Sequence, residues 1–487
     1  MTGASDPAAL LRVSQMQEAD RLTEAAGISG KDLMHNAGTA VAREVMTRWS
    51  PRPVTVLCGP GNNGGDGFVV AGALSSAGWR VRVALLGPVA HLHGDAALHA
   101  GRWKGPVEPL DEGVLDGTEL VVDALFGAGL SRPLGADVTR VLAAAAGRRI
   151  PTAAVDVPSG VMGDTGESLG AIQAQLTVTF TRKKPAHLLL PGRDLCGTQV
   201  LADIGTPASV LERIEVDTWE NGPALWRQRL PQVGAADNKY SRGHALLVGG
   251  YPTTGAARMA ARAAARMGAG LTSIAVPERG LDVYAAALTS IMVRPLPSAR
   301  DLPRLLEDRR FTAYLIGPGA GVDEETRERT LAMLATGRPV LLDADALTVF
   351  AGRPKDLFRA IRGPCVLTPH EGEFARLFDA SGDKLTRARR AARDSGALIV
   401  LKGADTVIAA PDGRAVVNGN APPTLATGGA GDVLGGMILG LLTQGMDAFA
   451  AAAAAVWLHG AAALDFGPGL LAEDLPDLLP GVLRRLA

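Results

Sequence analysis

Two glycine-rich segments with the residue types to bind anions lie far apart in the chain. The first is GPGNNGGDG at residues 59–67, and the second is TGGAGD at residues 427–432. Each follows an apolar, strand-like run and opens a helix-like run, so backbone N–H groups would gather around an anion at a helix N-terminus. Each also carries a carboxylate. One such segment suggests a nucleotide or phosphate site, and two different ones suggest two active sites on two domains.

The first segment has G-x-G-x-x-G spacing but lacks the rest of a dinucleotide-binding fingerprint. That fingerprint includes an acidic residue at the end of the second strand, about 20 residues further on. The second predicted strand, at residues 81–86, is followed by GPVA instead. Asn62, Asn63 and Asp66 add amide and carboxylate groups that a purely structural turn would not need. The segment therefore predicts a ligand pocket that differs from an ordinary Rossmann cofactor site.

Two further acidic residues lie at predicted strand ends in the same half. Asp123 lies in the run at 120–125, and Asp156 follows the run at 152–155. A carboxylate at a strand end is commonly a helix cap, so neither residue is decisive alone. Ligands, however, bind at the carboxyl ends of strands in an open parallel sheet. Together these segments would deliver five polar side chains to one crevice, namely Asn63, Asp66, Asp123, Asp156 and Ser159.

The second segment places Asp432 directly after its glycines. An acidic residue at a helix start is often only a favourable partner of the helix dipole. The G-A-G-D pattern nevertheless resembles the anion hole and catalytic base of ribokinase-like small-molecule kinases. In that chemistry the aspartate takes a proton from the substrate hydroxyl, and the glycine loop neutralises the transferring phosphoryl group.

These side chains must be positioned by two series of apolar, strand-length runs. The first series is at residues 54–58, 81–86, 120–125, 152–155, 176–180 and 199–202. The second is at residues 245–248, 271–276, 313–316, 340–343, 365–368, 397–401 and 406–409. Helix-like segments connect them, including 37–49, 70–77, 255–267 and 432–443. Continuous apolar strands separated by helices predict parallel sheets covered on both faces.

The fold class predicted is therefore α/β, with two domains. An N-terminal Rossmann-like, three-layer parallel-sheet domain would span 1–222, and a C-terminal ribokinase-like α/β domain would span 223–487. The boundary is placed near residue 222 because residues 205–237 hold several prolines and little periodicity.

Composition narrows the class of protein. The 487 residues have a net charge of −1, which gives no basic face for nucleic acid. Three scattered cysteines form no disulfide framework or metal spacing, which favours a reducing compartment. The N-terminus lacks a signal-peptide pattern, and the Ala-rich run at 448–457 is too short to span a bilayer and predicts a buried helix. We expect a cytoplasmic protein that binds neither nucleic acid nor membrane.

The first half resembles the N-terminal domain of the YjeF family, the NAD(P)H-hydrate epimerases, over residues 10–205. The motifs GNNGGDG, DALFGAGLSRP and DVPSG carry the resemblance. It implies a substrate pocket of Asn62, Asn63, Gly64, Gly65, Asp66, Gly127, Ala128, Gly129, Leu130, Ser131, Arg132, Pro133 and Asp156. It also implies K+ held by Asn63, Asp123 and Ser159, whose hard oxygens suit such a cation.

Asp156 matches the acidic residue that this family places against the substrate. We expect it to be catalytic and to transfer the proton that accompanies epimerisation at C6 of the hydrated nicotinamide ring. The sequence leaves open whether hydroxide or a ring proton is lost and added back.

The second half resembles the ADP/ATP-dependent NAD(P)H-hydrate dehydratase domain over residues 235–485. KYSRGHALLVGG, TPHEGEF, LKGADT and GGAGDVL carry the resemblance as a set. It implies that Mg2+ and an adenine nucleotide are bound, with the nucleotide contacting Lys402, Gly403, Ala404, Asp405, Thr406, Gly428, Gly429, Ala430 and Gly431. It also implies that the hydrated dinucleotide contacts Ala256, Gly319, His370 and Asp432, with Asp432 as the catalytic base. His370 could instead be a structural residue at a strand end.

The sequence thus predicts a bifunctional repair enzyme. One domain would interconvert the R and S forms of NAD(P)HX, and the other would dehydrate the S form to NAD(P)H with ADP or ATP, giving AMP or ADP and phosphate. Phosphorylating the C6 hydroxyl would turn a poor leaving group into a good one. The resemblance favours ADP, and we expect a homo-oligomer. Two alternatives remain: a kinase of a vitamin-like alcohol, and a first domain that is only a Rossmann-like binding module.

Overall fold

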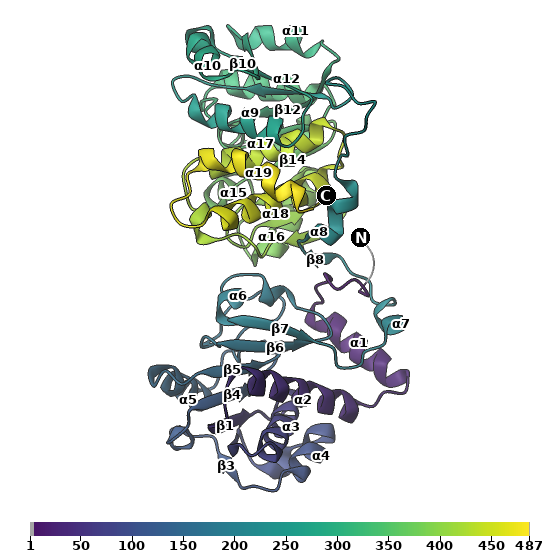
Figure 1. Cartoon of the computed structure of the whole chain (residues 1–487), viewed down its shortest axis with the longest axis vertical. Helices are drawn as coiled ribbons and strands as arrows, with labels where there is room; N and C mark the ends of the chain where they lie inside the picture. The colour runs from purple at the N-terminus through teal and green to yellow at the C-terminus, as the bar shows by residue number, and fades with distance from the viewer. Residues whose placement is uncertain (1–3, 487) are drawn as a thin grey trace. The chain divides into compact units, whose positions relative to one another are not determined.

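The computed structural model describes residues 4–486 and divides the chain into two compact units, Met1–Thr218 and Trp219–Ala487. Each unit is built around one predominantly parallel sheet with helices packed against it (Figure 1). The predicted α/β class is confirmed.

In the first unit the described strands form a sheet in the order β3-β2-β1-β4-β5-β6-β7, with every pair parallel. The strands are β1 (Pro53–Cys58), β2 (Arg80–Leu85), β3 (Val107–Pro109), β4 (Leu120–Ala124), β5 (Thr152–Val155), β6 (Leu176–Phe180) and β7 (Thr198–Ala202). The predicted runs are all present, and β3 is additional. It was missed because three half-exposed residues give no apolar run. The order of the strands reverses between β1 and β4, because β2 and β3 are added on one side of β1 and β4 to β7 on the other, and ligands bind at this switch point in such sheets.

The helices of this unit cover both faces of the sheet (Figure 1). They are α1 (Val13–Ala25), α2 (Gly30–Arg48), α3 (Asn62–Ser76), α4 (Gly94–Arg102), α5 (Ala136–Gly147), α6 (Gly192–Leu195) and α7 (Ala208–Leu211). Helices α2, α3 and α4 share one core with the strands, and α5 packs in a second core on the other face. Continuous apolar strands such as β4, buried throughout, are what two covered faces require.

The first glycine-rich segment is mostly helix, because α3 already begins at Asn62. The predicted helix at 70–77 was too short, since glycines inside a helix lower its propensity. Packing explains Gly67, where a Cβ would lie 2.7 Å from the Ala124 Cβ and 2.8 Å from the Cys58 Sγ. This glycine lets α3 approach β1 and β4 closely.

In the second unit the described strands run in the order β11-β10-β9-β12-β13-β14-β15-β16-β17-β8. They are β8 (Thr218–Glu220), β9 (His244–Val248), β10 (Leu271–Val276), β11 (Met292–Pro295), β12 (Phe311–Ile316), β13 (Val340–Leu342), β14 (Cys365–Leu367), β15 (Leu398–Leu401), β16 (Val407–Ala409) and β17 (Ala415–Val417). Strands β9 to β15 are parallel, and β16 and β17 are antiparallel additions. The sequence did not predict β8, β11 or β17, which are each only three or four residues long.

The helices of the second unit are α8 (Pro223–Trp226), α9 (Gly255–Arg266), α10 (Leu281–Ala287), α11 (Leu302–Leu306), α12 (Glu324–Ala335), α13 (Asp345–Thr348), α14 (Pro354–Ala360), α15 (Glu371–Leu377), α16 (Lys384–Ser395), α17 (Ala430–Thr443), α18 (Ala448–Phe466) and α19 (Leu475–Arg484). Helices α9 and α17 pack with their backbones close. A Cβ at Gly436 would lie 2.0 Å from the Ala260 carbonyl oxygen, and one at Gly440 would lie 2.5 Å from that of Ala264. These contacts fix the helix that carries Asp432.

Two expectations for this unit were wrong. The second glycine-rich segment does not follow a strand directly, because β17 ends at Val417 and a 3-10 helix, η7 (Pro423–Leu425), intervenes. The Ala-rich helix α18 extends to Phe466, well beyond the predicted end at 457. By length and composition alone this helix could cross a membrane, and 78% of its most apolar window is buried inside the protein.

Candidate functional sites

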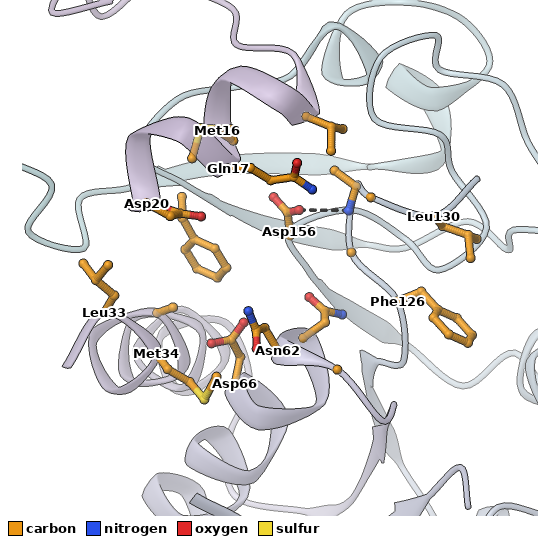
Figure 2. Close-up of a pocket in the computed structure, with 18 of the residues that line it drawn as sticks. Met16, Gln17, Asp20, Leu33, Met34, Asn62, Asp66, Phe126, Leu130 and Asp156 are labelled. Carbon is orange, nitrogen blue, oxygen red and sulfur yellow. Dashed lines mark hydrogen bonds between the residues drawn. The ribbon is translucent and has the colours of Figure 1, made fainter. Parts of the chain in front are cut away.

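A cavity of about 580 Å³ lies at the carboxyl edge of the first sheet (Figure 2). Its walls come from α1, α2, the start of α3, the segment after β4, and the residues that follow β5 and β6. Of the predicted epimerase residues, those that line it are Asn62, Asn63, Asp66, Gly127, Ala128, Gly129, Leu130, Ser131, Arg132 and Asp156. Gly64, Gly65 and Pro133 are not in the lining. At Gly64 the reason is packing, since a Cβ would lie 1.8 Å from the Gly59 carbonyl oxygen.

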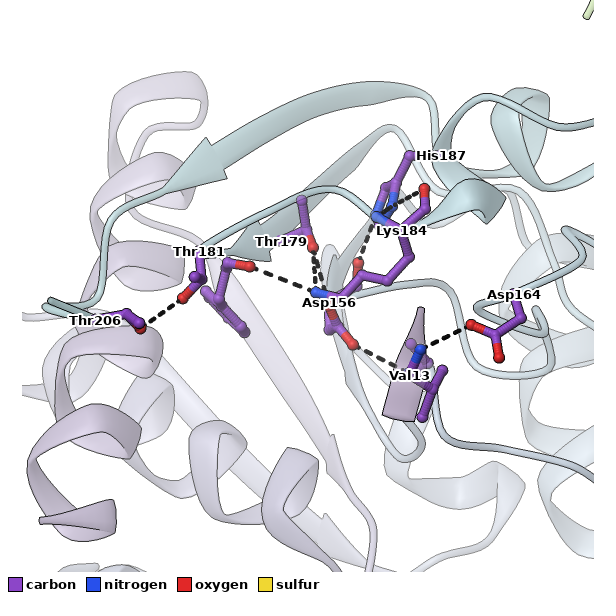
Figure 3. A network of polar contacts seen from close by, with 10 residues as sticks. Val13, Asp156, Asp164, Thr179, Thr181, Lys184, His187 and Thr206 are labelled. Atoms are coloured by element: carbon purple, nitrogen blue, oxygen red, sulfur yellow. Dashed lines mark hydrogen bonds and ion pairs between the residues drawn. The ribbon is translucent and has the colours of Figure 1, made fainter. Parts of the chain in front are cut away.

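Asp156 is held at this edge by a dense polar network (Figure 3). Its backbone is in the left-handed region, at φ +68. One carboxylate oxygen accepts hydrogen bonds from the Lys184 Nζ at 2.6 Å and the Thr179 Oγ1 at 2.9 Å. The other accepts the Ala128 backbone N–H at 3.0 Å. The His187 Nε2 lies 3.0 Å from the Asp156 carbonyl oxygen and stabilises this backbone conformation.

The network fixes the charge of Asp156. Burial by itself raises a carboxyl pKa, but the charge and hydrogen bond of Lys184 and the Ala128 N–H outweigh it. They lower the pKa of Asp156 to about 2. Burial and the Lys184 charge likewise lower the pKa of His187 to about 4, so this imidazole is neutral at pH 7. Asp156 therefore stays ionised at any physiological pH.

The three residues expected to hold K+ lie beneath the cavity and at its edge. Asp123 and Ser159 are fully buried, and the Ser159 Oγ donates to the Asp123 Oδ1 at 2.6 Å. Burial raises the pKa of Asp123 despite the hydrogen bonds from Ser159. Asn63 has a buried Nδ2 without a partner, and its Oδ1 lies 3.2 Å from where a Gly127 Cβ would be.

These features fit a cation with oxygen ligands. A positive ion would offset the burial of the Asp123 carboxylate, and serine and amide oxygens are suitable additional ligands. Rotating the Asn63 amide by half a turn would place its oxygen where the unpartnered Nδ2 now lies. Among the described residues, no group of three or more His, Cys, Asp or Glu could hold a metal ion.

Sequence reasoning missed α1 and Lys184 as parts of this cavity. Helix α1 contributes Met16, Gln17 and Asp20 to the lining (Figure 2). Burial raises the pKa of Asp20 to about 6, with the charge of Lys184 acting against it and that of Asp156 adding to it. A pattern was available, because the cavity-facing residues of α1 recur at helical spacing.

The second candidate site centres on a partly buried lysine at the carboxyl edge of the second sheet. The Lys402 Nζ lies 2.8 Å from the Asp343 Oδ1 and 3.9 Å from the Glu373 Oε2. Burial disfavours its charge, but these carboxylates outweigh burial and raise the pKa of Lys402. The glycine segment lies over the lysine, since a Cβ at Gly431 would be 3.3 Å from its Nζ. The predicted residues Lys402 and Gly431 are thus brought together.

Asp432 starts helix α17 next to this lysine. Burial raises the pKa of Asp432 to about 6, with the nearby Asp343 charge adding to the rise and Lys402 opposing it. Before the helix, Gly429 has φ +95, and a Cβ there would lie 2.5 Å from the Met259 Cε. A residue with a side chain would be strained at that position.

The other predicted residues of this half lie in segments that converge on the same edge. Gly319 approaches the segment just before α9, because a Cβ at Gly319 would be 2.5 Å from the Thr253 carbonyl oxygen, and Ala256 is the second residue of that helix. In the 402–406 segment, Asp405 is paired with the Lys384 Nζ at 2.6 Å, and Thr406 closes the turn by bonding the Gly403 carbonyl. Asp405 is therefore engaged by the protein itself.

His370 has a structural task at the start of α15. Its Nδ1 accepts the Gly372 and Glu373 backbone N–H groups at 2.9 and 3.3 Å, so it caps the N-terminus of α15. This leaves Nε2 as the protonated nitrogen, 3.4 Å from the Glu373 Oε1. The backbone N–H of Lys402 bonds the Pro369 carbonyl at 2.9 Å, which places His370 beside the lysine segment.

Two family models match this chain. One, described as NAD(P)H-hydrate dehydratase, matches residues 245–479, and the other, described as YjeF-related protein N-terminus, matches residues 30–186. A ribokinase-like superfamily protein from Enterococcus faecalis has a solved structure that is 26% identical, with a TM-score of 0.51, covering 56% of this chain and 97% of that one. The ribokinase-like fold predicted for the second unit is confirmed.

Curated relatives match across both units. The bifunctional NAD(P)H-hydrate repair enzyme Nnr of Salinibacter ruber is 38% identical over 522 residues, covering 97% of this chain and 96% of that protein. The protein of the same name from Escherichia coli is 34% identical over 502 residues, covering 97% of this chain and 93% of that protein. With these full-length matches and both sites in one chain, the protein belongs to the family of bifunctional NAD(P)H-hydrate repair enzymes.

Proposed function

We propose that the chain repairs hydrated NAD(P)H in two steps, with the first unit interconverting the R and S forms of NAD(P)HX. The second unit then dehydrates the S form to NAD(P)H, using ADP or ATP and giving AMP or ADP and phosphate. One observation carries the proposal. Each unit presents an aspartate beside a lysine at the carboxyl edge of its sheet, and the pKa values of the two aspartates are shifted in opposite directions.

In the first unit the substrate occupies the 580 Å³ cavity. Asn62, Asn63 and Asp66 bind it from the start of α3, and Gly127 to Arg132 bind it from the segment after β4. Asp156 serves as a fixed negative acceptor for the hydrated ring. A carboxylate with a pKa of about 2 is a weak base, so its contribution is to orient and to stabilise positive charge.

K+ is held in this unit by Asn63, Asp123 and Ser159. The fully buried Asp123 carboxylate and the unpartnered amide end of Asn63 support this assignment. The ion would hold the segments after β4 and β5 together, because Asp123 ends one and Ser159 belongs to the other. Its positive charge would stabilise the buried Asp123 carboxylate.

In the second unit Asp432 accepts the proton of the C6 hydroxyl as that oxygen attacks the terminal phosphoryl group. A pKa of about 6 makes Asp432 ionised but usefully basic near neutral pH. Residues 428–431 present backbone N–H groups to the transferring charge at the start of α17. Phosphate then leaves from C6 with the electron pair of the C6–O bond, assisted by the lone pair of the ring nitrogen, and loss of a proton from C5 to water restores the C5–C6 double bond of NAD(P)H.

The nucleotide lies along Lys402 to Thr406 and the glycine segment. Lys402 supplies the positive charge, and its position against Gly431 brings it to the transferring group. Mg2+ accompanies the nucleotide phosphates and neutralises their charge. The oxygen ligands that it prefers would come mainly from the nucleotide phosphates themselves. Ala256, Gly319 and His370 contact the hydrated dinucleotide.

The proposal is tested with the intact chain and a mixture of NADHX epimers. With ADP or ATP and Mg2+, recovery of NADH absorbance should proceed to completion, because the first unit replenishes the S form. Recovery that stops when the S form is exhausted would contradict epimerisation. Accumulation of a stable phosphorylated product would instead favour a conventional kinase. Comparing ADP with ATP, and NADHX with NADPHX, defines the preferred substrates.

A further inference from the structure

One face of α1 forms a wall of the first-unit cavity. Val13, Met16, Gln17, Asp20 and Glu24 all line it, and their spacing places them on one side of a helix. The start of the helix is fixed beside the lysine segment, since the Leu11 N–H bonds the Lys183 carbonyl at 3.0 Å. Asp20 therefore projects into the cavity from a fixed element (Figure 2).

Asp20 differs from Asp156 in having no hydrogen-bond donor among the described residues. Lys184 is only 3% exposed, and its Nζ already donates hydrogen bonds to Asp156 and Thr179. Asp66 on α3 is likewise 9% exposed and lines the cavity. Both carboxyls face the space where substrate would lie, and burial raises both pKa values. A carboxyl with a pKa near 6 can both give and take a proton at neutral pH.

More acidic than basic side chains line the cavity, although burial favours the neutral form of two of them, Asp20 and Asp66. Its lining includes five carboxyl side chains, Asp20, Glu24, Asp66, Asp95 and Asp156. The cationic side chains in the lining are Lys184 and Arg132. Such a site stabilises a cation that forms on the ring better than it stabilises an anion. This favours departure of the C6 hydroxyl over removal of a ring proton.

We infer that Asp20 is the proton-exchanging residue of epimerisation, and that the reaction passes through loss and return of water at C6. This inference rests on the proposed function of the first unit. Protonated Asp20 gives its proton to the C6 hydroxyl, and the C6–O bond breaks with its electron pair leaving on water. The ring-nitrogen lone pair forms a double bond to C6, which gives a cation. Water adds to the other face of C6 and returns a proton to the Asp20 carboxylate.

Asp20→Asn in the full chain tests the residue. Chromatography follows the conversion of purified R-NADHX to the S form in the absence of nucleotide. After subtraction of the uncatalysed rate, the rate of this conversion should be about 100-fold or more below that of the parent. Glu18→Gln is the matched control, because Glu18 lies on the same helix and pairs with Arg21 outside the cavity. Its rate should stay within twofold of the parent.

The same Asp20→Asn sample should dehydrate S-NADHX with ADP at the parent rate, which shows that the chain is folded. A parent chain that does not interconvert the epimers would overturn the proposed function itself. If the parent interconverts them and Asp20→Asn retains more than half the rate, Asp20 is not the proton-exchanging residue.

Isotopic water tests the route independently. In H2(18)O the parent should incorporate the heavy oxygen at C6 in step with epimerisation, and mass spectrometry of the product reports this. Heavy-oxygen incorporation that matches the extent of interconversion supports loss of water. Complete retention of the original oxygen in epimerised product overturns this route.

Discussion

The two candidate sites use the same pair of residue types and reach opposite electrostatic results. In the first unit, Lys184 binds the aspartate of the site directly, at 2.6 Å, and the pKa of Asp156 falls to about 2. In the second unit, Lys402 binds Asp343 and lies near Glu373, and the pKa of Asp432 rises to about 6. The lysine keeps Asp156 ionised by binding it directly, whereas burial and the nearby Asp343 charge make Asp432 the more basic carboxylate.

This comparison also clarifies what each site lacks. A permanently ionised Asp156 needs a second group to exchange protons, and Asp20, also with a pKa of about 6, is placed to supply it. In the second unit, Asp432 as proton acceptor and the backbone N–H groups that would bind the anion lie together at the start of α17. One helix N-terminus suits a site that accepts a proton close to a bound anion, because its backbone N–H groups stabilise the negative charge.

The largest expected effect is the separation of the two activities. Asp432→Asn should lower nucleotide-dependent dehydration of S-NADHX by about 10²–10⁴-fold, because a proton acceptor is lost. Exchange between the R and S forms should be unchanged. Asp156→Asn should instead lower exchange between the R and S forms and leave dehydration of S-NADHX unchanged. NADH absorbance measures dehydration, and chromatography of the epimers measures exchange. Dehydration by Asp432→Asn near the parent rate would remove this residue as the base.

The same two substitutions should change stability in opposite directions. Asp156→Asn leaves the buried Lys184 without its carboxylate, which should cost about 3–5 kcal/mol in the free energy of unfolding of the first unit. Asp432→Asn removes a carboxylate whose ionisation is disfavoured in the fold and should stabilise the second unit by up to about 3 kcal/mol at pH 7. Urea unfolding with probes for each unit gives both values. Changes of the same sign would contradict the comparison.

The pH dependence of stability should differ between the units, in windows set by these pKa values. Asp432 has a folded pKa of about 6 against 3.8 for the free carboxyl, so the folded state binds more protons between them. Its contribution to the free energy of unfolding should therefore fall by up to about 3 kcal/mol as the pH rises from 4 to 6. Asp156 has a depressed pKa, and its contribution of roughly 2–3 kcal/mol should be lost only as the pH falls from about 4 to 2.

Differences between parent and variant isolate these two contributions. The stability difference between the parent and Asp432→Asn should change between pH 4 and 6, and that between the parent and Asp156→Asn should change below pH 4. A flat difference across the corresponding window would show that the carboxyl does not have the pKa assigned to it.

Much of this arrangement could be predicted from the sequence. Continuous apolar runs identified the central strands of both sheets, and parallel sheets place their carboxyl ends at one edge. That was sufficient to bring Asn63, Asp66 and Asp156 to one cavity and Asp432 to a second site. The short strands β3 and β11 were missed because each contains a charged residue and a proline, which interrupt an apolar run.

What the sequence could not give is the pairing of charges. Lys184 and Asp156 are separated by 28 positions, and nothing in either motif states that they form an ion pair. Lys402 and Asp343 are likewise joined by a 2.8 Å hydrogen bond across 59 positions. Such pKa values follow from tertiary contacts and burial, which local patterns do not contain. The contribution of Asp20 was missed for the same reason.

The smallest expected effects concern two glycines that touch the ionic groups compared above. A Cβ at Gly127 would lie 3.2 Å from both the Asn63 Oδ1 and the Asp156 Oδ2. Asp156 is held by its other donors and cannot yield easily, so Gly127→Ala should reduce epimerisation about fivefold, which corresponds to the lower end of overpacking costs. Gly135→Ala is the control in the same segment, since nothing lies within 4 Å of its Cβ position.

In the second unit, a Cβ at Gly431 would lie 3.3 Å from the Lys402 Nζ, the end of a flexible side chain. Gly431→Ala should therefore lower the dehydration rate at saturating nucleotide by no more than about twofold, below the usual overpacking range. The two rates, each divided by that of the parent, test whether Asp156 is the more rigidly held of the two ionic groups. A larger loss for Gly431→Ala than for Gly127→Ala would reverse that order, because it would mean that Lys402 is fixed more firmly than Asp156.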